Sequence, residues 1–388
     1  MPAFQKASIL KDYFMSGKFK AALLRLLLVL HLLTSLLLLL SVLLPLLHPR
    51  AFWPSGLAGL FFVPLLALSL CFIPVWWWWY KRPYYWLSII LLLPCIPAME
   101  VSFGLHPFRQ QPLEKKDNGF TIMSFNTSSM GLKHYMEDSA EQQSIYDMLQ
   151  TASPDILCLQ EFYTSPNKDR TDHLSLIQER LGYSDHFFTN DGNFFYTCYV
   201  GIVLYSRFPI LHATRILLDT TNLGSGNSVL QADLRIDNDT VRVFALQLKS
   251  YMFRDAEYQD IRRIKTLRDI TLSASRHVLA KMYPTFARRA QEADTLHTLI
   301  AQSPYPVLLC GDFNDVPVSY TYRTISRDMN DAFLSQGWGL GRTFHALSPT
   351  LRIDYILSQP AFQIDGYASF ARKGFEHVPI MAALSLRR

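Results

Sequence analysis

The chain has 388 residues, of which 49% are hydrophobic, and a mean hydropathy of +0.10. Most of the hydrophobic excess falls in the first hundred residues, so the composition indicates a membrane segment joined to a soluble domain. The formal net charge of +5 is modest, and several basic residues flank the apolar spans, so the charge is poor evidence for nucleic-acid binding. The five cysteines show neither a disulfide framework nor a zinc-ligand spacing.

Three apolar runs predict about three transmembrane helices within residues 1–100. The first, residues 26–47, is uncharged and would extend about 33 Å as a helix, enough to cross a hydrocarbon core of about 30 Å. The second, residues 57–79, ends in four tryptophans followed by Tyr80, which is typical of a membrane interface. The third, residues 84–99, is shorter and contains Pro94 and Pro97, and the sidedness of the protein depends on whether it crosses.

The basic residues predict which side of the membrane carries the soluble domain. Five precede the first span and two follow the second, at Lys81 and Arg82, whereas the first connection offers Arg50 beside His48. The positive-inside rule then predicts a cytoplasmic N-terminus. Three crossings would place the domain on the extracytoplasmic side of a bacterial inner membrane, and two would leave it in the cytoplasm. A cleaved signal peptide is disfavoured by the length of the first span and by the two spans that follow.

Residues 101–118 are polar and read as a linker, and residues 119–388 suit one large domain. Helical stretches, notably residues 138–151 and 172–181, fall between short β-rich runs. These runs are residues 120–125, 155–159, 201–205, 229–235, 241–248, 306–310, 353–357 and 380–386. This mixture predicts a two-sheet α/β sandwich with helices outside.

Carboxylates, carboxamides and an imidazole recur where these runs begin or end. They are Asn126, Glu161, Asp312, Asn314, Asp354, Glu376 and His377. Asp312 and Asn314 belong to the tetrapeptide 311–314 that directly follows the apolar run 306–310, and on an extended backbone residues two apart point to the same side. Polar groups repeated at strand ends indicate one shared site, and their types suit the hydrolysis of a phosphoester.

In their order along the chain, these residues resemble the motifs of the endonuclease/exonuclease/phosphatase family, which has the fold of DNase I. The resemblance covers roughly residues 119–388, and its specificity lies in the order of the motifs. It implies a four-layer α/β sandwich, in which two packed mixed β-sheets are flanked by helices. It also implies hydrolysis of phosphoester bonds with the help of a divalent cation.

For the cation, the resemblance implies Mg²⁺ or Mn²⁺ bound near the ends of the first two runs. Mg²⁺ takes only one or two carboxylates and keeps several waters, so Glu161 is the leading ligand. Asn126 is uncharged and would hydrogen-bond the metal shell or the phosphate without repelling it. Glu376 is expected to contribute a further carboxylate to the metal site.

Acid–base roles implied by the resemblance fall to the remaining motif residues. Asp312 would orient and deprotonate the attacking water, and Asn314 would donate to a phosphate oxygen. His377 would donate to the phosphate and stabilise the transition state, with Asp354 holding its imidazole in one tautomer.

The chain departs from the family pattern at two motifs. Where many members carry an Asn-x-His-Leu strand, residues 245–248 read ALQL. Gln247 can still donate to a phosphate oxygen but cannot exchange a proton near neutrality. Where the last motif is usually Ser-Asp-His, residues 375–377 read FEH, so Glu376 keeps the charge on a longer arm. These departures leave open a degenerate member that binds phosphorylated ligands or partners without turnover.

Between Gln247 and Pro306 the sequence predicts a long, largely helical insertion rich in arginine. Its arginines are Arg254, Arg262, Arg263, Arg268, Arg276, Arg288 and Arg289. A solvated helix face with i,i+4 charge pairs is favoured over a role in substrate binding.

Taken together, the sequence predicts a membrane-anchored, metal-dependent phosphodiesterase. Its expected partners are the lipid bilayer and a phosphodiester substrate, either nucleic acid or a phospholipid headgroup. No obligate protein partner is indicated. The motifs leave the substrate open, because substrate choice depends on the loops that flank the shared site.

Overall fold

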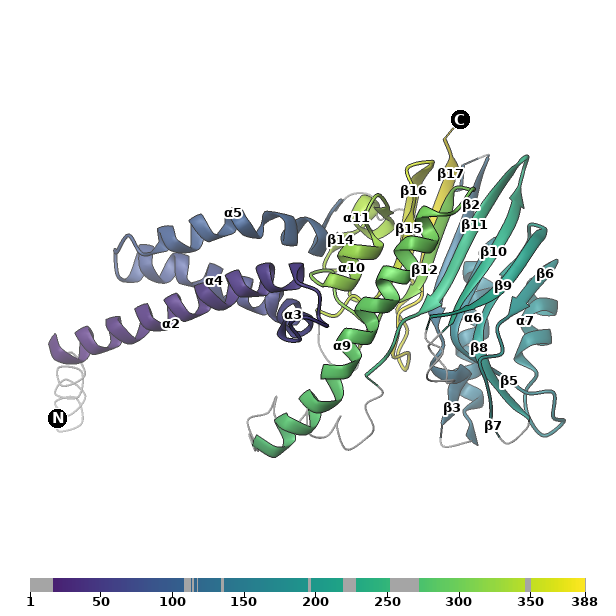
Figure 1. The fold of residues 1–388 in the computed structure, drawn as a ribbon, viewed down its shortest axis with the longest axis horizontal. Coiled ribbons are helices and arrows are strands. Elements are labelled where there is room, and N and C mark those ends of the chain that lie inside the picture. The colour runs from purple at the N-terminus through teal and green to yellow at the C-terminus, as the bar shows by residue number, and fades with distance from the viewer. Residues whose placement is uncertain are drawn as a thin grey trace, which may run out of the picture.

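The structure is a computed structural model that describes residues 17–107, 113, 115–116, 118–133, 136–194, 197–218, 228–251, 272–345 and 350–387. Within these residues, a bundle of three long helical segments adjoins a sandwich of two β-sheets with helices on both outer faces (Figure 1). The four-layer α/β sandwich and the N-terminal apolar helices predicted from the sequence are therefore present.

The helices of the bundle match the three predicted apolar spans. They are α2 (Gly17–Leu43), α4 (Phe62–Pro74) with the preceding α3 (Pro54–Ala58), and α5 (Tyr85–Ser102). The stretches Phe19–Leu46, Pro54–Trp78 and Tyr85–Ser102 are each long and apolar enough to cross a membrane. The third run stays helical through Pro94 and Pro97 and, with 18 residues, extends about 27 Å.

A buried polar network ties the three helices together. Trp76 Nε1 donates to His31 Nδ1 at 2.9 Å, and His31 Nε2 lies 2.8 Å from Ser88 Oγ. Ser88 Oγ in turn donates to the carbonyl of Ser69 at 2.9 Å. His31, Ser69, Trp76 and Ser88 are all completely buried. Hydrogen bonds between apolar helices fix their rotation and register, so His31 has a structural role here.

The first sheet has six strands, with β11 and β12 parallel and the other neighbours antiparallel. Their order is β13 (Asn330–Asp331), β15 (Asp354–Ser358), β12 (Val307–Asp312), β11 (Asp239–Gln247), β10 (Ser228–Ile236) and β9 (Ile210–Leu217).

The second sheet has seven strands, with β2 and β5 parallel. Its order is β16 (Phe362–Ser369), β17 (Ile380–Leu386), β2 (Gly119–Asn126), β5 (Ile156–Thr164), β8 (Cys198–Ser206) and β6 (Asp185–Phe188), with β7 (Gly192–Phe194) also paired to β8. Two-stranded ribbons join β1 (Gly104–Leu105) to β14 (Trp338–Gly339), and β3 (Leu132–Lys133) to β4 (Met136–Glu137).

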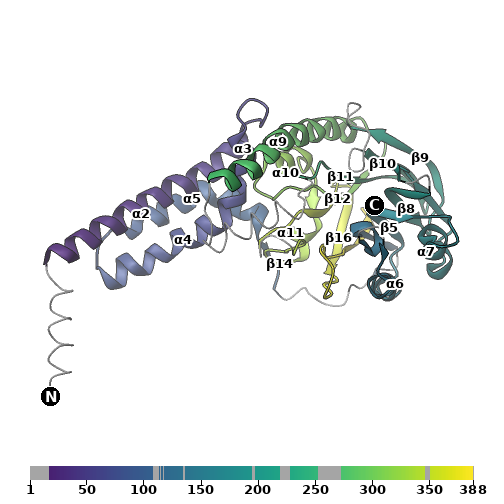
Figure 2. The same cartoon turned by 90° about the horizontal axis from the view of Figure 1, so that it is seen from below.

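Helices cover both outer faces of the sandwich (Figure 2). On the second sheet lie α6 (Ser139–Ala152) and α7 (His173–Leu181), which begin at the capping side chains of Asp138 and Asp172. On the first lie α9 (Leu272–Ala301) and α10 (Tyr320–Ile325), and the short α11 (Ala332–Gln336) sits beside β15 and β16. Each helix buries one apolar face against its sheet.

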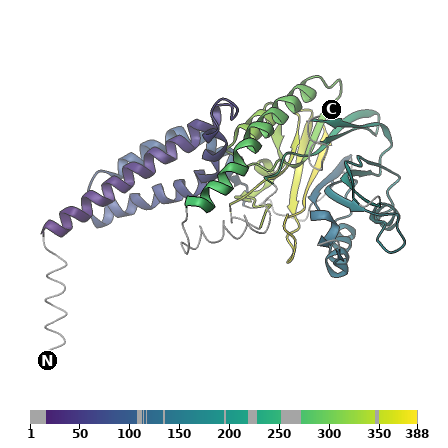
Figure 3. The same ribbon diagram turned by 60° about the horizontal axis from the view of Figure 1, so that its bottom comes forward.

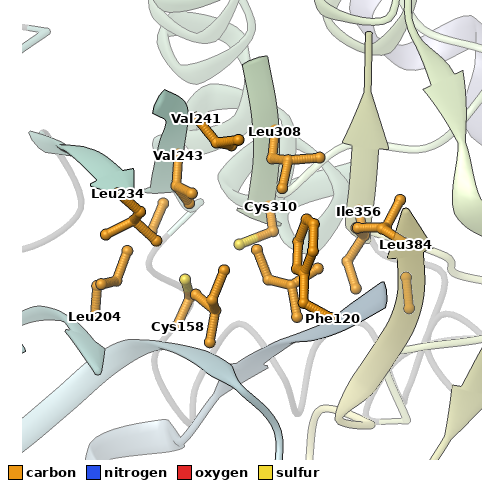
Figure 4. Packing of buried hydrophobic residues seen from close by; sticks show 14 of the residues in the cluster. Phe120, Cys158, Leu204, Leu234, Val241, Val243, Leu308, Cys310, Ile356 and Leu384 are labelled. Atoms are coloured by element: carbon orange, nitrogen blue, oxygen red, sulfur yellow. The ribbon is translucent and has the colours of Figure 1, made fainter. Parts of the chain in front are cut away.

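Alternate residues of the central strands fill the space between the sheets. Figure 4 shows Phe120, Cys158 and Leu204 of one sheet facing Leu308 and Cys310 of the other. The residues between them in sequence, such as Leu157 and Leu309, pack instead against the outer helices. Cys158 and Cys310 are completely buried, as expected for cysteines acting as small apolar side chains.

Every β-rich run and both helices marked in the sequence have a counterpart in the structure. The strands of two or three residues had no predicted run, and among strands of four or more residues those without one are β6, β9 and β16, which lie at sheet edges. Their residues are partly exposed, so they lack the continuous apolar signal of the central strands. Of the predicted helical insertion, α9 is described, whereas Arg254, Arg262, Arg263 and Arg268 lie outside the described residues.

The bundle packs directly on the sandwich through several described contacts. Arg323 Nη2 donates to the carbonyl of Leu46 at 3.1 Å, at the end of the first span. Arg352, which is 1% exposed, donates to the carbonyl of Val101 at 2.5 Å near the end of α5. Residues 104–105, expected to lie in a linker, form β1 and pair with the sandwich ribbon strand β14. Residues 104–105 of the predicted linker are therefore part of the folded structure.

Gly311 in β12 provides a test of the packing that positions the strand ends. Its φ is +150°, and an added Cβ would lie 1.9 Å from the carbonyl oxygen of Leu246. We expect Gly311→Ala to lower the free energy of unfolding by about 3 kcal/mol or more. Thermal unfolding of the full-length protein in detergent, followed by circular dichroism, measures the change.

Gly182→Ala is the matched control for that experiment. Gly182 also has a positive φ, of +67°, but nothing lies within 4 Å of an added Cβ. We expect this variant to lose only about 1 kcal/mol, the cost of a left-handed alanine. Equal losses in the two variants would show that contact with Leu246 does not constrain β12.

Candidate active site

Three polar side chains line up across neighbouring strands of the first sheet. In the parallel pairing of β11 with β12, Gln247 lies opposite Asp312. In the antiparallel pairing of β12 with β15, Asp312 lies opposite Asp354. All three are nearly fully buried, with exposures of 5%, 1% and 3%. Strand register thus brings together residues that are far apart in the sequence.

The second sheet contributes Asn126, at the end of β2, and Glu161, which lies within β5 because this strand continues to Thr164 instead of ending before Glu161. The pairing of β5 with β8 shifts register between Leu159 and Phe162, and Glu161 has a φ of +46°. This bulge interrupts the side-chain alternation of the strand. Asn126 Nδ2 then lies 3.0 Å from Glu161 Oε1 and 3.0 Å from Asp312 Oδ2. One amide therefore joins carboxylates that come from different sheets.

Around Asn126 the backbone is unusually strained. Its Oδ1 accepts from the backbone N–H of Ser128 at 3.0 Å, which leaves the amide nitrogen facing the two carboxylates. Ser128, Ser129 and Met130 follow with φ values of +47°, +64° and +52°. Positive φ at non-glycine residues costs free energy, and such residues concentrate at functional sites.

Asn314 joins the site by a different route from the one expected. The strand ends at Asp312, and Asn314 turns back with a φ of +51° instead of continuing an extended backbone. Its N–H donates to Asp312 Oδ1 at 2.8 Å, and its Nδ2 donates to the carbonyl of Leu248 at 3.0 Å and to Asp312 Oδ2 at 3.1 Å. The prediction that Asp312 and Asn314 lie together is confirmed, but its extended-strand reason is wrong.

His377 completes the buried row through Asp354. Its Nδ1 lies 3.0 Å from Asp354 Oδ2, and its Nε2 is 3.9 Å from Asp312 Oδ2. Burial alone would lower the pKa of the His377 imidazole, but the carboxylates of Asp354, Asp312 and Glu161 raise it to about 10. His377 is therefore an imidazolium at neutral pH and can donate from Nε2.

Asp312 has the most perturbed carboxyl group in this row. Burial and the neighbouring carboxylate of Asp354 raise its pKa to about 7, against the opposing effect of His377. A carboxyl group with a pKa near neutrality can accept a proton from a bound water. The position of Asp312 between Asp354 and Asn126 follows from strand pairing, so its pKa is set by the fold.

The donor atoms suit a hard divalent cation. Oxygens of Glu161 and Asp312 converge on the same Asn126 amide. Among the described residues, Asp312 and Asp354 form ion pairs with the same cation, His377, and Glu161 adds a third carboxylate, so negative charge exceeds positive charge. Asp312, Asp354 and His377 also offer ligand atoms within 4.8 Å of one another, although His377 Nδ1 is already bonded to Asp354. Glu161 and Asp312 therefore present carboxylate oxygens of the kind that Mg²⁺ and Mn²⁺ bind.

Comparison with known proteins agrees with this geometry. The model of the Endonuclease/Exonuclease/phosphatase family matches residues 123–375. The chain belongs to this family. Members of the family are generally hydrolases that act on phosphoester bonds and are typically dependent on a divalent metal. A second model, described as a domain of unknown function, matches residues 24–102, which cover the apolar helices.

Several solved structures resemble the sandwich. An endonuclease/exonuclease/phosphatase from Bacteroides vulgatus is 15% identical, with a TM-score of 0.48, and the match covers 69% of this chain and 99% of that one. One from Beutenbergia cavernae is 18% identical, with a TM-score of 0.47, and coverage is 69% and 72%. The human Nocturnin catalytic domain with bound sulfate is 16% identical, with a TM-score of 0.47 and coverage of 73% and 99%. No curated protein matches by sequence.

Two predicted site residues of this family member have unexpected surroundings. Gln247 Nε2 donates a hydrogen bond to Glu161 Oε1, so Gln247 orients the carboxylate that was expected to bind the metal. Glu376 is exposed, whereas the adjacent His377 is buried. The structure therefore does not bring Glu376 into the buried cluster, because neighbouring residues of an extended segment point to opposite sides.

Supporting residues that the motifs did not reveal also hold the site. Thr343 Oγ1 accepts from the N–H groups of Ile353 and Asp354, both at 3.0 Å. Arg289 of α9 is completely buried and donates to the carbonyl of Lys249 at 2.9 Å from Nη2. Thr343 belongs to no recognisable motif, and the sequence around Arg289 predicts a solvated helix face instead of a buried contact.

Replacing Asp354 tests the electrostatic origin of the His377 pKa. Asp354→Asn removes the nearest negative charge, so we expect the pKa of His377 to fall from about 10 toward the ordinary value near 6.5. Below its pKa the imidazole is protonated, so the variant loses its proton at lower pH than wild type. NMR titration of histidine-labelled protein measures this, with the His377 signal assigned by its absence in His377→Gln.

Asp233→Asn serves as the control for this titration, since Asp233 pairs with Arg242 at 2.7 Å, away from His377. It should leave the His377 titration unchanged. An Asp354→Asn variant with the wild-type titration would rule out Asp354 as the cause of the raised pKa.

Proposed function

We propose that this protein is a membrane-anchored phosphodiesterase that uses Mg²⁺ or Mn²⁺. The observation that carries the proposal is the meeting of Glu161 and Asp312 at the Asn126 amide, with His377 as an imidazolium 3.9 Å from Asp312. Phosphodiester hydrolysis needs stabilisation of charge on the phosphoryl oxygens, an oriented water and help for the leaving oxygen.

Each of these needs has a candidate group at the site. Glu161 would hold the cation, which supplies charge neutralisation when bound. Asp312 has a pKa suited to accepting a proton from water, and His377 would donate to a phosphoryl oxygen. Asp354 fixes the imidazole through Nδ1, so that Nε2 faces the site.

Gln247 would act through Glu161. The hydrogen bond from its amide fixes Glu161 Oε1 without adding a charge or a titrating proton. The missing imidazole at position 247 therefore leaves His377 as the proton donor of the proposed site. Asn314 would keep Asp312 oriented through its backbone N–H and its side chain.

For the membrane, we propose three crossings with the sandwich on the extracytoplasmic side of a bacterial inner membrane. Both the connection between the first two spans and the end of α5 contact the sandwich, so these ends share one side. Lys20, Arg25, Lys81 and Arg82 lie at or near the opposite ends of the spans. That distribution agrees with a cytoplasmic N-terminus under the positive-inside rule.

Hydrolysis by the full-length protein in detergent tests the catalytic proposal. With Mg²⁺ or Mn²⁺ we expect turnover of an activated phosphodiester or of DNA, RNA or sphingomyelin, and none with EDTA. Glu161→Gln should abolish the divalent-dependent rate and weaken Mg²⁺ binding in calorimetry. His377→Ala should cost at least about 10² in rate, the usual scale for such groups.

Glu179→Gln, on the exposed face of α7, is the matched control and should retain wild-type activity and metal binding. Unchanged metal affinity in Glu161→Gln would exclude Glu161 as a ligand. A wild-type protein that binds phosphate ligands but hydrolyses none of these substrates would favour the non-catalytic alternative.

Reporter fusions test the membrane orientation. Alkaline phosphatase joined after Arg388 should be active, and green fluorescent protein at the same position should be dark, because each reporter works on one side of the bacterial inner membrane. The same reporters joined after Arg82 should give the reverse pattern. Fluorescence from the fusion after Arg388 would place the sandwich in the cytoplasm.

A further inference from the structure

The N-terminal half of α9 has a basic face beside the bundle. Its residues from Leu272 to Ala290 include four basic side chains and no aspartate or glutamate. Arg276 and Arg288 are exposed. The next acid along the helix, Glu292, is 3% exposed and accepts from the N–H of Lys249 at 2.9 Å. Arg276 and Arg288 form no ion pair with another described residue, and their exposure agrees with the solvated helix face expected from the sequence.

This half of α9 lies where the bundle meets the sandwich. The ring of Tyr283 lies edge-on to Trp53, in the connection between the first two spans, with centroids 6.0 Å apart. Phe286 packs against Gly56, where an added Cβ would lie 2.4 Å from the phenyl ring. Figures 2 and 3 show α9 running from the sandwich to the side of the bundle near α3.

Arginines from other elements extend the basic face around the end of the bundle. Arg323 of α10 is exposed and contacts the carbonyl of Leu46, and Arg50 is exposed in the same connection as Trp53. We call Arg50, Arg276, Arg288 and Arg323 the basic collar. The carboxylate of Asp294 also lies in this region, but it is bonded elsewhere. It accepts a hydrogen bond from the Tyr320 hydroxyl at 2.8 Å and lies 3.2 Å from His48 Nε2.

Exposed aromatic rings accompany the basic collar. Trp53 and Tyr283 are 37% and 54% exposed, although they contact each other. Arg276 and Tyr283 are seven residues apart on α9 and so point to the same side of the helix. Amphipathic aromatic rings with neighbouring arginines are typical of the headgroup layer of a membrane.

We propose that the basic collar binds the headgroups of anionic phospholipids in the leaflet that faces the sandwich. The collar is continuous with the ends of the apolar spans, so headgroups are the closest available phosphates. The positive-inside rule accounts for the basic residues at the far ends of the spans but not for these. The proposal rests on the membrane anchoring proposed above and does not require hydrolytic activity.

Helix α9 also links the collar to the candidate active site. Arg289, next to Arg288, pairs with Asp315 at 3.4 Å and donates to the carbonyl of Lys249. Asp315 follows Asn314 in the sequence, and Lys249 lies two residues after Gln247. Lipid bound at the collar would therefore contact the helix that holds the loops after β11 and β12.

Site-specific crosslinking tests the proposal in full-length protein. Tyr283→p-benzoylphenylalanine protein is placed in nanodiscs of equal phosphatidylglycerol and phosphatidylcholine, illuminated, and analysed by mass spectrometry for attached lipid. We expect phosphatidylglycerol to be enriched at least about fivefold, the factor that one basic side chain near an anionic surface provides. The enrichment should fall at high salt, because the attraction is electrostatic.

Adding Arg276→Glu and Arg288→Glu should abolish the enrichment. Arg235→Glu with Arg387→Glu makes the same change in charge at exposed residues of the sandwich and should leave it intact. Equal capture of the two lipids, or no lipid capture, would overturn the proposal. So would preferential capture of a single-stranded oligonucleotide added to the same nanodiscs. Each readout is independent of hydrolysis, so it stands whether or not the catalytic assay succeeds.

Discussion

The close approach of β11 and β12 at Gly311 is the constraint on which the site depends. Only a residue without a Cβ fits against the carbonyl of Leu246, and this approach fixes the register of Asp312 beside Gln247. The antiparallel partner β15 then places Asp354 opposite Asp312. Proton affinity at Asp312 and His377 follows from that row, because burial and neighbouring charge act on groups that cannot move apart.

The candidate active site requires residues from both sheets. Neither sheet alone contains both the converging carboxylates and the imidazolium, since Glu161 comes from β5 and Asp312 from β12. Asn126 crosses the gap and touches both. The inter-sheet core beneath these residues, with Cys158 facing Cys310, keeps the distance constant. The distances within the site therefore depend on how the two sheets pack against each other.

Much of this arrangement could be predicted from the sequence, and the exceptions have physical reasons. Continuous apolar residues indicate a central strand, so the sequence predicts β2, β5, β11 and β12 in the correct places. Edge strands such as β9 have their apolar residues interrupted by polar ones. The motifs predicted that Asp312 and Asn314 belong together, but a left-handed turn is not visible in residue spacing. Thr343 and Arg289 act through backbone atoms of distant segments, and such long-range contacts leave no local pattern.

The hydrogen bond from Arg352 to Val101 bears on where this protein can be divided. Arg352 pairs with Asp331, lies over Phe333 and Tyr355, and precedes Asp354 by two residues. A fragment beginning after the apolar helices would leave one guanidinium donor in an apolar pocket without its acceptor. Removing the apolar helices would therefore cost the sandwich this buried hydrogen bond, about 1–3 kcal/mol of its free energy of unfolding, beside a residue that leads directly into β15.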